Sequence, residues 1–221
     1  MTTEYYSFVR SEIAPLLPPT ATRILDVGCG IGATAAWLKS KYPGSRTVGL
    51  EGNAALLPEL ARNVDEPRIV DLNDPFPEVG TVDLVLLLDV LEHLIQPEAV
   101  LARIVSVIAE NATVLISLPN VAHLSVSLRL LFLGRFDYAD AGILDRTHLH
   151  FFYKESAVNL ARAAGLEVEK GLISGLQGPR TRWMDRLTFG LMRERLTKQY
   201  IFSARRSGFV ARSRLSWQLT S

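Results

Sequence analysis

The stretch RILDVGCGIGA, residues 23–33, decides the fold class. Residues 23–27 have the apolar composition of a short buried strand, interrupted by Asp26, and residues 33–41 have the spacing of a helix. Between them, Gly28, Gly30 and Gly32 form a glycine-rich turn. At the carboxyl end of a parallel strand, such a turn lets backbone N–H groups approach a ligand that a Cβ atom would exclude. The stretch therefore predicts a strand, a turn that binds a cofactor, and a helix.

The same alternation of strand and helix continues on both sides of this stretch. Upstream, prolines at 15, 18 and 19 are expected to end a helix that begins near Glu4, because proline removes a helical hydrogen bond. Downstream, the predicted elements are strands over 46–51, 68–72, 82–89 and 112–118 and helices over 54–63 and 97–108. Apolar strands that alternate with helices indicate a parallel sheet covered on both faces. The sequence therefore predicts a doubly wound α/β fold.

The pattern changes after Pro119. Residues 126–132 are apolar and expected to be helical, whereas 134–147 form a polar loop, so we expect 119–152 to be an insertion or lid over the sheet edge. A helix over 154–164 and strands over 166–172 and 200–204 resume the alternation. Residues 1–221 are expected to form a single domain, with a basic segment at 172–198.

Composition narrows the class of protein. The 221 residues are 48% hydrophobic and 21% charged, which is enough apolar material for a sizeable core. Charged residues interrupt the longest apolar stretches, so no transmembrane helix is expected, and Glu4 stands where a signal peptide needs a basic segment. We expect a cytoplasmic protein. The single cysteine, Cys29, can form no internal disulfide, and the turn around it favours packing over nucleophilic chemistry.

Asp26 distinguishes between two cofactor classes. Gly28, Gly30 and Ala33 also satisfy the dinucleotide pattern G-x-G-x-x-[GA], with Glu51 near the distance expected for an acid that binds ribose hydroxyls. An NAD-dependent dehydrogenase is therefore an alternative. An anion at Asp26, however, repels a pyrophosphate, whereas a cofactor that carries an ammonium and a sulfonium tolerates or uses that carboxylate.

Four motifs in chain order resemble one enzyme family. Residues 24–32 (ILDVGCGIG) look like the first motif of the class I S-adenosylmethionine-dependent methyltransferases, and the resemblance continues through 49–51 (GLE), 70–72 (VDL) and 89–93 (DVLEH). It implies S-adenosyl-L-methionine as cofactor. It also implies a Rossmann-like, mostly parallel seven-stranded sheet with an antiparallel C-terminal edge hairpin. Within the family, the sequence is similar to the type 11/23 methyltransferases and to quinone-biosynthesis O-methyltransferases.

The resemblance also assigns roles to individual residues. Glu51 is implied to accept hydrogen bonds from the ribose hydroxyls, and Asp71 to face the adenine amino group. Arg10 is implied to lie near the cofactor carboxylate, with Tyr5 or Tyr6 on the same helix closing the pocket. The full cofactor-binding set is Arg10, Asp26, Gly28, Gly30, Gly32, Glu51, Asp71, Leu72, Leu88 and Asp89.

The segment after Pro119 resembles two groups with different functions. Residues 119–123 (PNVAH), 133–138 (LGRFDY) and 145–152 (DRTHLHFF) are similar to a bacterial subgroup associated with sugar or polysaccharide methylation. Residues 119–123 are also similar to a family tied to methionine biosynthesis that acts beside an acyltransferase. We therefore expect O-methylation of a small molecule, with a sugar or glycan precursor as one candidate. A non-catalytic partner protein that binds S-adenosylmethionine is the alternative.

Two histidines are the expected catalytic residues. His123 follows the last apolar strand of the parallel series and His148 lies in the polar loop over the same edge, where ligands bind in open parallel sheets. A neutral imidazole is well matched to taking a proton from an acceptor hydroxyl at neutral pH. His93 and His150 are expected to be structural.

Asp89, Glu92 and His93 resemble the E-x-x-E-H metal pattern of some quinone methyltransferases, with a shorter acid in the first position. At spacings of i, i+3 and i+4 they are expected to share a helical face. We interpret them as structural and expect no bound metal.

The C-terminal fifth is basic. From Arg180 onward there are ten Lys or Arg residues and two acids, and Trp183, Met184, Leu187 and Leu191 recur among them at helical spacing. We expect a helix that packs this apolar stripe on the domain. A helix at a membrane surface, or one that faces a lipid-linked acceptor, is the alternative. No basic motif interleaved with aromatic residues is present, so the expected partner is a small-molecule acceptor and not a nucleic acid.

Overall fold

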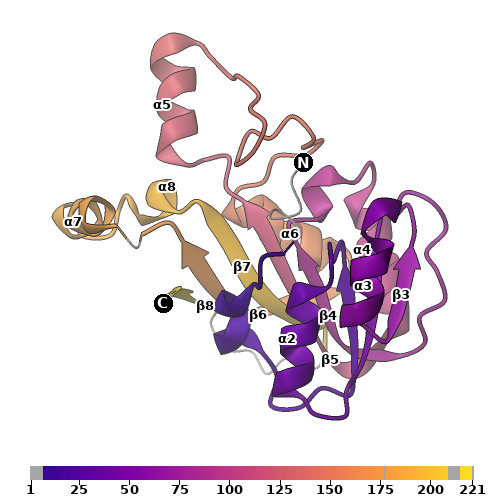
Figure 1. Ribbon diagram of the computed structural model, residues 1–221. Coiled ribbons are helices and arrows are strands. Elements are labelled where there is room, and N and C mark those ends of the chain that lie inside the picture. The colour runs from indigo at the N-terminus through magenta and orange to yellow at the C-terminus, as the bar shows by residue number, and fades with distance from the viewer. Residues whose placement is uncertain (1–6, 177, 209–214, 221) are drawn as a thin grey trace.

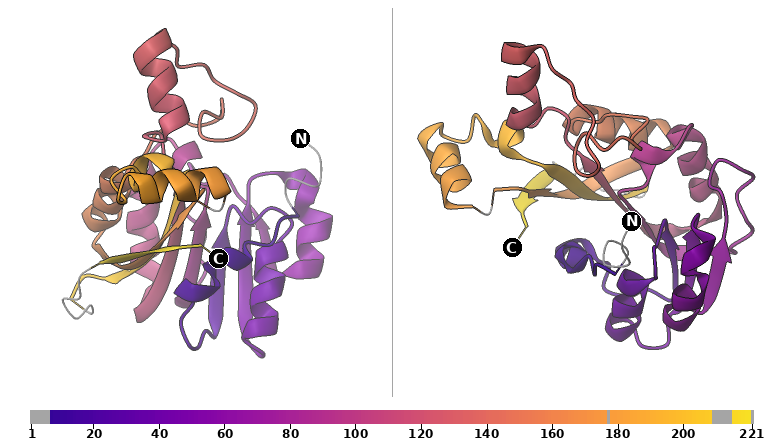
Figure 2. Two further views of the ribbon diagram at one scale, coloured as in Figure 1. Left: turned by 90° about the vertical axis from the view of Figure 1, so that its left-hand side faces the viewer. Right: turned by 45° about the horizontal axis from the view of Figure 1, so that its top comes forward.

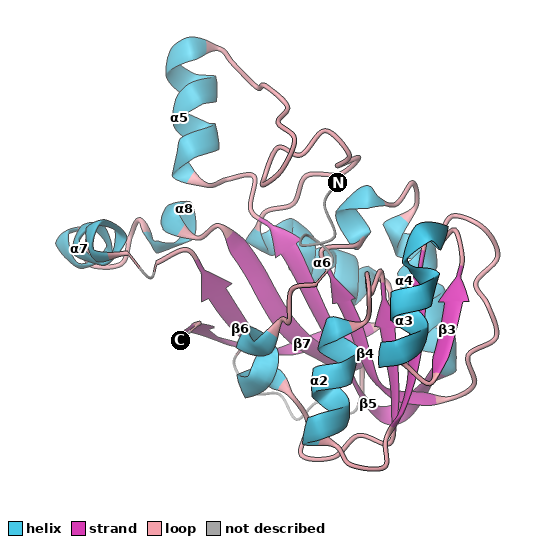
Figure 3. Cartoon of the chain, in the orientation of Figure 1, coloured by secondary structure: helices cyan, strands magenta, loops and turns pink. Residues whose placement is uncertain are grey.

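The computed structural model describes residues 7–176, 178–208 and 215–220. Its strands form one sheet of eight, in the order β3-β2-β1-β4-β5-β7-β6-β8 (Figures 1 and 3). The five strands from β3 to β5 are parallel. The strand order reverses between β1 and β4, which is the point where ligands bind in sheets of this kind. The predicted parallel α/β sheet is confirmed.

The parallel half of the sheet alternates with helices as the apolar pattern predicts. Its strands are β1 (Arg23–Val27), β2 (Arg46–Glu51), β3 (Glu66–Ile69), β4 (Val82–Leu88) and β5 (Ile108–Pro119). The helices before, among and after them are η1 (Ser11–Leu16), α2 (Ala33–Lys41), η2 (Ala54–Leu56), α3 (Leu57–Asn63), η3 (Leu91–His93), α4 (Pro97–Val107), α5 (Leu124–Leu133) and α6 (Lys154–Ala163).

Helices cover both faces of the sheet (Figure 2). On one face, Leu101 of α4 and Ala161 of α6 belong to the same core cluster as Leu25 and Leu87 of the central strands. On the other face, η1 and α2 pack on the remaining side chains of those strands, with Leu38 beside Leu86. Successive strand residues therefore point into opposite cores, which explains why the strands are apolar throughout.

The C-terminal strands are antiparallel, as the resemblance implies, but the sheet has eight strands and not seven. β6 (Leu166–Ser174) and β7 (Gln199–Arg206) are antiparallel, but β7 lies between β5 and β6, and an eighth strand, β8 (Ser216–Leu219), extends the edge in parallel to β6. Gly171 makes room for it, because a Cβ there would lie 2.2 Å from the ring of Trp217. The ring packs edge-on against Tyr200. The expected antiparallel C-terminal pair is confirmed, whereas the expected number of seven strands was wrong.

The N-terminal helix was also predicted wrongly. Residues 8–10 are not helical, and the short 3-10 helix η1 begins at Ser11 and contains Pro15. Tertiary contacts fix the extended entry, because the backbone N–H of Arg10 donates to Thr34 Oγ1 at 3.2 Å. Tyr5 and Tyr6, which were expected to close the pocket from this helix, lie outside the described residues.

Two other elements have boundaries that differ from the predicted ones. β3 begins at Glu66, and its pairing with β2 ends at Ile69, so Asp71 and Leu72 lie in the loop after the strand. The expected helix over 54–63 divides into η2 and α3, since Pro58 starts a new helix at its first turn.

Two helical segments project from the carboxyl edge of the sheet. α5 follows β5, while α7 (Pro179–Leu187) and α8 (Arg193–Leu196) connect β6 to β7 (Figures 1 and 2). Pro119 and Ser174 both pair with Gln199, so the two segments leave the sheet at one place. The apolar stripe of α7 does not pack on the domain as expected. Met184 packs, but Trp183 and Leu187 are exposed. Among the described residues, no helix reaches the length and apolarity that crossing a bilayer requires.

Candidate functional site

The glycine turn after β1 has a backbone that favours glycine. Gly28, Gly30 and Gly32 have φ angles of 66°, 57° and 78°, a region that side chains with a Cβ rarely adopt. A Cβ at Gly28 would lie 2.6 Å from a methyl carbon of Val90, so the turn packs directly on the chain that leaves β4. The N–H of Gly28 donates to the carbonyl oxygen of Leu50 at 2.8 Å. The turn is thereby fixed to both neighbouring strands.

Glu51, the last residue of β2, reaches back to this turn. Its Oε2 accepts a hydrogen bond from the N–H of Gly30 at 2.8 Å, and its Oε1 accepts one from Asn53 at 2.9 Å. Each carboxylate oxygen can accept two hydrogen bonds, so both keep acceptor capacity toward the pocket. This arrangement suits the binding of two neighbouring hydroxyl groups.

Asp26 is a buried acid beside the same turn. It is 4% exposed, and its Oδ2 has no hydrogen-bond partner among the described residues. Burial, followed by the negative charge of Glu51, raises the pKa of Asp26 to about 7, against the opposing effect of Arg10. A buried acceptor without a donor is destabilising, and an ammonium group in the pocket would supply one.

Asp89 closes the opposite side of the site. It has a positive φ of 59°, and it accepts hydrogen bonds from Ser117 Oγ at 2.8 Å and from Gln199. Arg10 Nη1 lies 2.5 Å from Asp89 Oδ2, and Arg10 Nε lies 2.5 Å from Glu12. The chain before η1 is therefore held across the end of β4.

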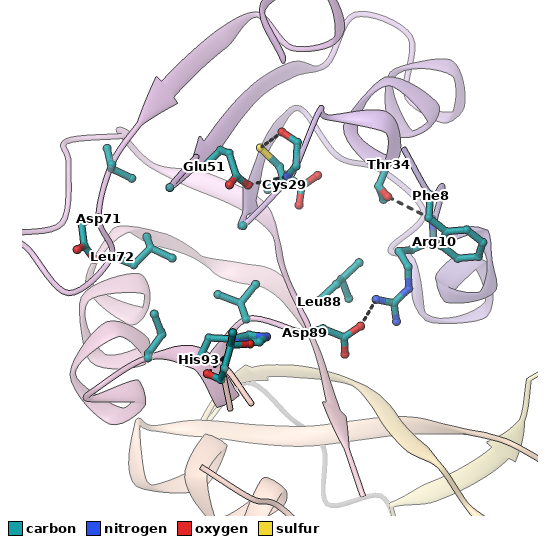
Figure 4. Close-up of a pocket in the computed structure, with 18 of the residues that line it drawn as sticks. Phe8, Arg10, Cys29, Thr34, Glu51, Asp71, Leu72, Leu88, Asp89 and His93 are labelled. Carbon is teal, nitrogen blue, oxygen red and sulfur yellow. Dashed lines mark hydrogen bonds and ion pairs between the residues drawn. The ribbon is translucent and has the colours of Figure 1, made fainter. Parts of the chain in front are cut away.

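These groups line one pocket with a volume of about 990 Å³. Asp71 and Leu72 lie at one end, while Phe8 and Arg10 lie at the other (Figure 4). Nine of the ten predicted cofactor residues line it, and the structure brings together residues that are up to 79 positions apart. The exception is Gly32, whose missing Cβ makes room for Leu60 and Val64. Gly32 serves the packing of α3 against the turn.

Several pocket residues were missed by reasoning from the sequence. Thr34, Thr147 and Gln199 line the pocket beside the predicted set. Gln199 precedes the apolar core of β7, and only the antiparallel pairing of β7 with β5 places it at Asp89. No local pattern marks such a residue.

The four histidines occupy different places. His93, which was expected to be structural, lines the pocket. His148 lies just behind it, with ring centroids 4.7 Å apart, and its Nδ1 bonds the carbonyl oxygen of Ile143 at 3.1 Å. His123 caps α5 by accepting from the N–H of Ser125 at 3.2 Å. Neither His123 nor His148 lines the pocket, so their catalytic role stays a prediction.

The histidine pair lies beside a buried acid. Ligand atoms of Glu92, His93 and His148 lie within 4.8 Å of one another, so these residues could hold a metal ion. Burial raises the pKa of Glu92 well above its usual range, and the charge of Asp89 adds to the effect. The expected helical face was wrong, because η3 begins only at Leu91 and the positive φ of Asp89 turns its side chain to Arg10.

A family model described as "Methyltransferase domain" matches residues 1–170 of this chain. The chain belongs to this methyltransferase domain family. S-adenosylmethionine is accordingly the cofactor that the pocket residues have to fit, and they do. The orphaned Asp26 Oδ2 suits the ammonium of its methionine part, and Glu51 suits its ribose hydroxyls.

Two individual methyltransferases are also similar to this chain. Trans-aconitate 2-methyltransferase from Variovorax paradoxus is 24% identical over 104 residues, which are 46% of this chain and 40% of that one. Methyltransferase str2 from Strobilurus tenacellus is 30% identical over 110 residues, which are 49% of this chain and 40% of that one. The match thus spans less than half the length of either relative.

Among solved structures, PKMT2 from Rickettsia typhi in complex with AdoHcy has a similar fold. The TM-score is 0.62 at 14% sequence identity, and the match covers 94% of this chain and 55% of that one. At this identity the likeness concerns the fold alone.

Proposed function

We propose that this chain transfers the methyl group of S-adenosylmethionine to an oxygen atom of a small-molecule acceptor, with a sugar or glycan precursor as the candidate class. The observation that supports S-adenosylmethionine as the cofactor is the charge of the pocket. Its lining contains one guanidinium, that of Arg10, against five acids, Glu12, Asp26, Glu51, Asp71 and Asp89. Such a lining attracts a cofactor that carries an ammonium and a sulfonium, and it repels the pyrophosphate of NAD.

The pocket also has room for an acceptor. At about 990 Å³ it lies at the upper end of the size range of ligand sites. Asp26 and Glu51 lie at the turn, whereas Leu94, His93 and Thr147 line another part of the wall. An acceptor beside the cofactor would meet these last residues. The relative that is named for trans-aconitate acts on a small molecule, which supports an acceptor of that class here.

The residues of the chain act by binding and orientation. S-adenosylmethionine, when bound, supplies a sulfonium methyl group that passes to the acceptor oxygen and leaves S-adenosylhomocysteine. Glu51 would hold the ribose of the cofactor and Asp26 its ammonium, while Asp89, clamped by Arg10 and Ser117, lines the opposite side of the pocket. Alignment of a preactivated methyl group with its acceptor supplies much of the rate.

The proton of an acceptor hydroxyl needs a base within reach. We place that base at the His93–His148 pair, since His93 lines the pocket and His148 packs against its ring. Burial lowers the pKa of His148, and His93 acts in the same direction, which favours the neutral imidazole that a base requires. Nδ1 of His93 lies 3.3 Å from the carbonyl oxygen of Thr147, which orients the ring from the loop.

Calorimetry followed by an acceptor screen tests this function. We expect one S-adenosylhomocysteine to bind per chain and no heat from NAD, and we expect transfer of labelled methyl to a hydroxyl compound. Tight NAD binding without an S-adenosylhomocysteine signal would overturn the cofactor assignment. Tight S-adenosylhomocysteine binding with no transfer to sugars, phenols or carboxylates would favour the non-catalytic partner protein.

A further inference from the structure

The two projecting helical segments carry apolar side chains that are exposed to solvent. On α5, Leu131 and Phe132 are each 74% exposed. In the turn after α7, Phe189 is 94% exposed and Leu191 is 85% exposed. We call these residues, together with Leu130, Leu133, Trp183 and Leu187, the projecting apolar surface. Single exposed apolar residues are common, but such a concentration on two neighbouring projections marks an interaction site.

The bases of the two projections are fixed to the body of the protein. Leu124 at the start of α5 and Met184 of α7 pack against the same cluster, which contains Leu176, Leu196 and Tyr200. Arg195 of α8 approaches the carbonyl oxygen of Ala122 at 3.5 Å. The apolar residues beyond these bases are therefore held away from the sheet, as Figure 1 and the right view of Figure 2 show for the helices.

Arginines accompany the exposed apolar residues of α7. α7 carries Arg180, Arg182 and Arg186, and no acidic side chain among the described residues lies within 4 Å of them. The one acid of α7, Asp185, is instead paired with Arg193 at 2.9 Å. The projections thus combine exposed apolar groups with unneutralised positive charge.

This combination narrows the choice of partner. A dimer that buried this surface would bring two basic α7 segments close together, and their like charges oppose such a contact. The exposed tips of the two projections are convex, so they do not require a protein partner with a complementary hollow. A lipid surface receives convex apolar tips at the boundary of headgroups and acyl chains, and its phosphates attract the arginines.

We propose that the projecting apolar surface docks on a bilayer that contains anionic phospholipids. Phe189, Leu191, Leu131 and Phe132 enter the boundary region, and Arg180, Arg182 and Arg186 lie at lipid phosphates. The surface and the pocket share the carboxyl edge of the sheet, so docking places the pocket beside the membrane. Docking itself does not depend on methyl transfer.

Vesicle flotation tests the proposal with the full chain. We expect the protein to float with vesicles of phosphatidylcholine and phosphatidylglycerol, to bind phosphatidylcholine alone weakly, and to be released by salt. The double variant Phe189→Ser, Leu191→Ser and the triple variant Arg180→Gln, Arg182→Gln, Arg186→Gln should each lower binding by about tenfold or more. Leu57→Ser and Arg62→Gln on the exposed face of α3 are matched controls and should bind as the unchanged protein does.

Two results would overturn the proposal. One is failure to bind anionic vesicles while circular dichroism and S-adenosylhomocysteine binding show an intact protein. The other is a dimer in light scattering that the double variant dissociates, because a second copy would then cover the surface. If the unchanged protein does not bind S-adenosylhomocysteine, the proposed function is contradicted. The result of the vesicle experiment does not depend on that outcome.

Discussion

Arg10 and Asp89 are joined by an ion pair whose Nη1 and Oδ2 atoms lie 2.5 Å apart, although the residues are 79 positions apart in the chain (Figure 4). Asp89 lies after β4 and Arg10 precedes η1, so the pair closes the N-terminal segment onto the carboxyl edge of the sheet. Burial opposes the charge of Arg10, whereas Asp89 and Glu12 raise its pKa. The guanidinium is thus a permanent charge at an otherwise acidic site.

Removal of this guanidinium should loosen the site. We expect Arg10→Ala to weaken S-adenosylhomocysteine binding severalfold and to lower the melting temperature by a few degrees, because hydrogen bonds between charged groups are lost. Calorimetry and thermal unfolding measure the two effects. Arg46→Ala, which removes an exposed partner of Glu66 far from the pocket, serves as the control. Unchanged affinity for S-adenosylhomocysteine would show that the segment before η1 has no part in binding.

Replacement of Glu51 should weaken the cofactor complex more strongly. We expect Glu51→Ala to raise the dissociation constant of S-adenosylhomocysteine tenfold or more, at about 1.5–3 kcal/mol for each hydrogen bond to the charged carboxylate. The fold should persist, as circular dichroism would show. Glu98→Ala on α4 is the control, since Glu98 is exposed and outside the pocket. A dissociation constant unaffected by Glu51→Ala would mean that another acid holds the ribose.

Binding should depend on pH through Asp26. Its pKa is about 7 in the ligand-free protein, so the carboxylate that attracts an ammonium is mostly protonated at pH 6 and ionised at pH 8. The affinity for S-adenosylhomocysteine should therefore rise about tenfold between these values. Asp26→Asn should remove this dependence and bind weakly at both. A variant that keeps the full pH profile would assign it to another group.

The raised pKa of Asp26 should have the opposite effect on the stability of the folded protein. Because the pKa of Asp26 is raised on folding, the folded protein holds this proton more tightly than the unfolded chain. The stabilising contribution is present at acid pH and is lost as the pH rises through about 7. Without ligand, Asp26→Asn should therefore melt at a higher temperature than the unchanged protein at pH 8, and the difference should shrink as the pH is lowered toward 3.8, the ordinary pKa of the group.

The histidine pair should affect turnover more than binding. With a hydroxyl acceptor identified, we expect His93→Ala to lower kcat about a hundredfold, and His148→Ala to lower it less, with little change in cofactor affinity. His150→Ala is the control, because its Nε2 contacts only the carbonyl oxygen of Ile95 among the hydrogen bonds of the described residues. A large loss of kcat in His123→Ala alone would transfer the role to His123. Parallel losses of kcat and melting temperature would indicate a structural role.

Chelation should leave turnover intact. Asp89 is held by Arg10 and does not join Glu92 and His93, and the raised pKa of Glu92 opposes the ionised form that a metal ion would bind. Activity in the presence of EDTA checks this expectation. Inactivation by EDTA that a divalent ion reverses would instead identify Glu92, His93 and His148 as ligands.

Local sequence was sufficient for the parallel half of the fold and for most of the pocket. The run of apolar residues before Gly28, and the further runs ending at Glu51 and Leu88, predict strands whose ends are the binding edge, because parallel strands align their carboxyl ends. For the same reason, nine predicted cofactor residues from separate motifs line one pocket. Short-range composition determines the strands, whereas Arg10, Asp71, Leu72, Leu88 and Asp89 were assigned to the cofactor through the resemblance to the methyltransferases.

Only the tertiary structure decided which residues meet across the sheet. β8 is four residues long and pairs with β6 because Gly171 admits Trp217, a contact that no pattern in either segment encodes alone. Gln199 reaches Asp89, and His148 reaches His93, through strand order and loop path. The apolar residues of α7 have helical spacing whether they face a core or solvent. Their exposure depends on what the rest of the chain places opposite them, and the sequence of the helix does not contain that information.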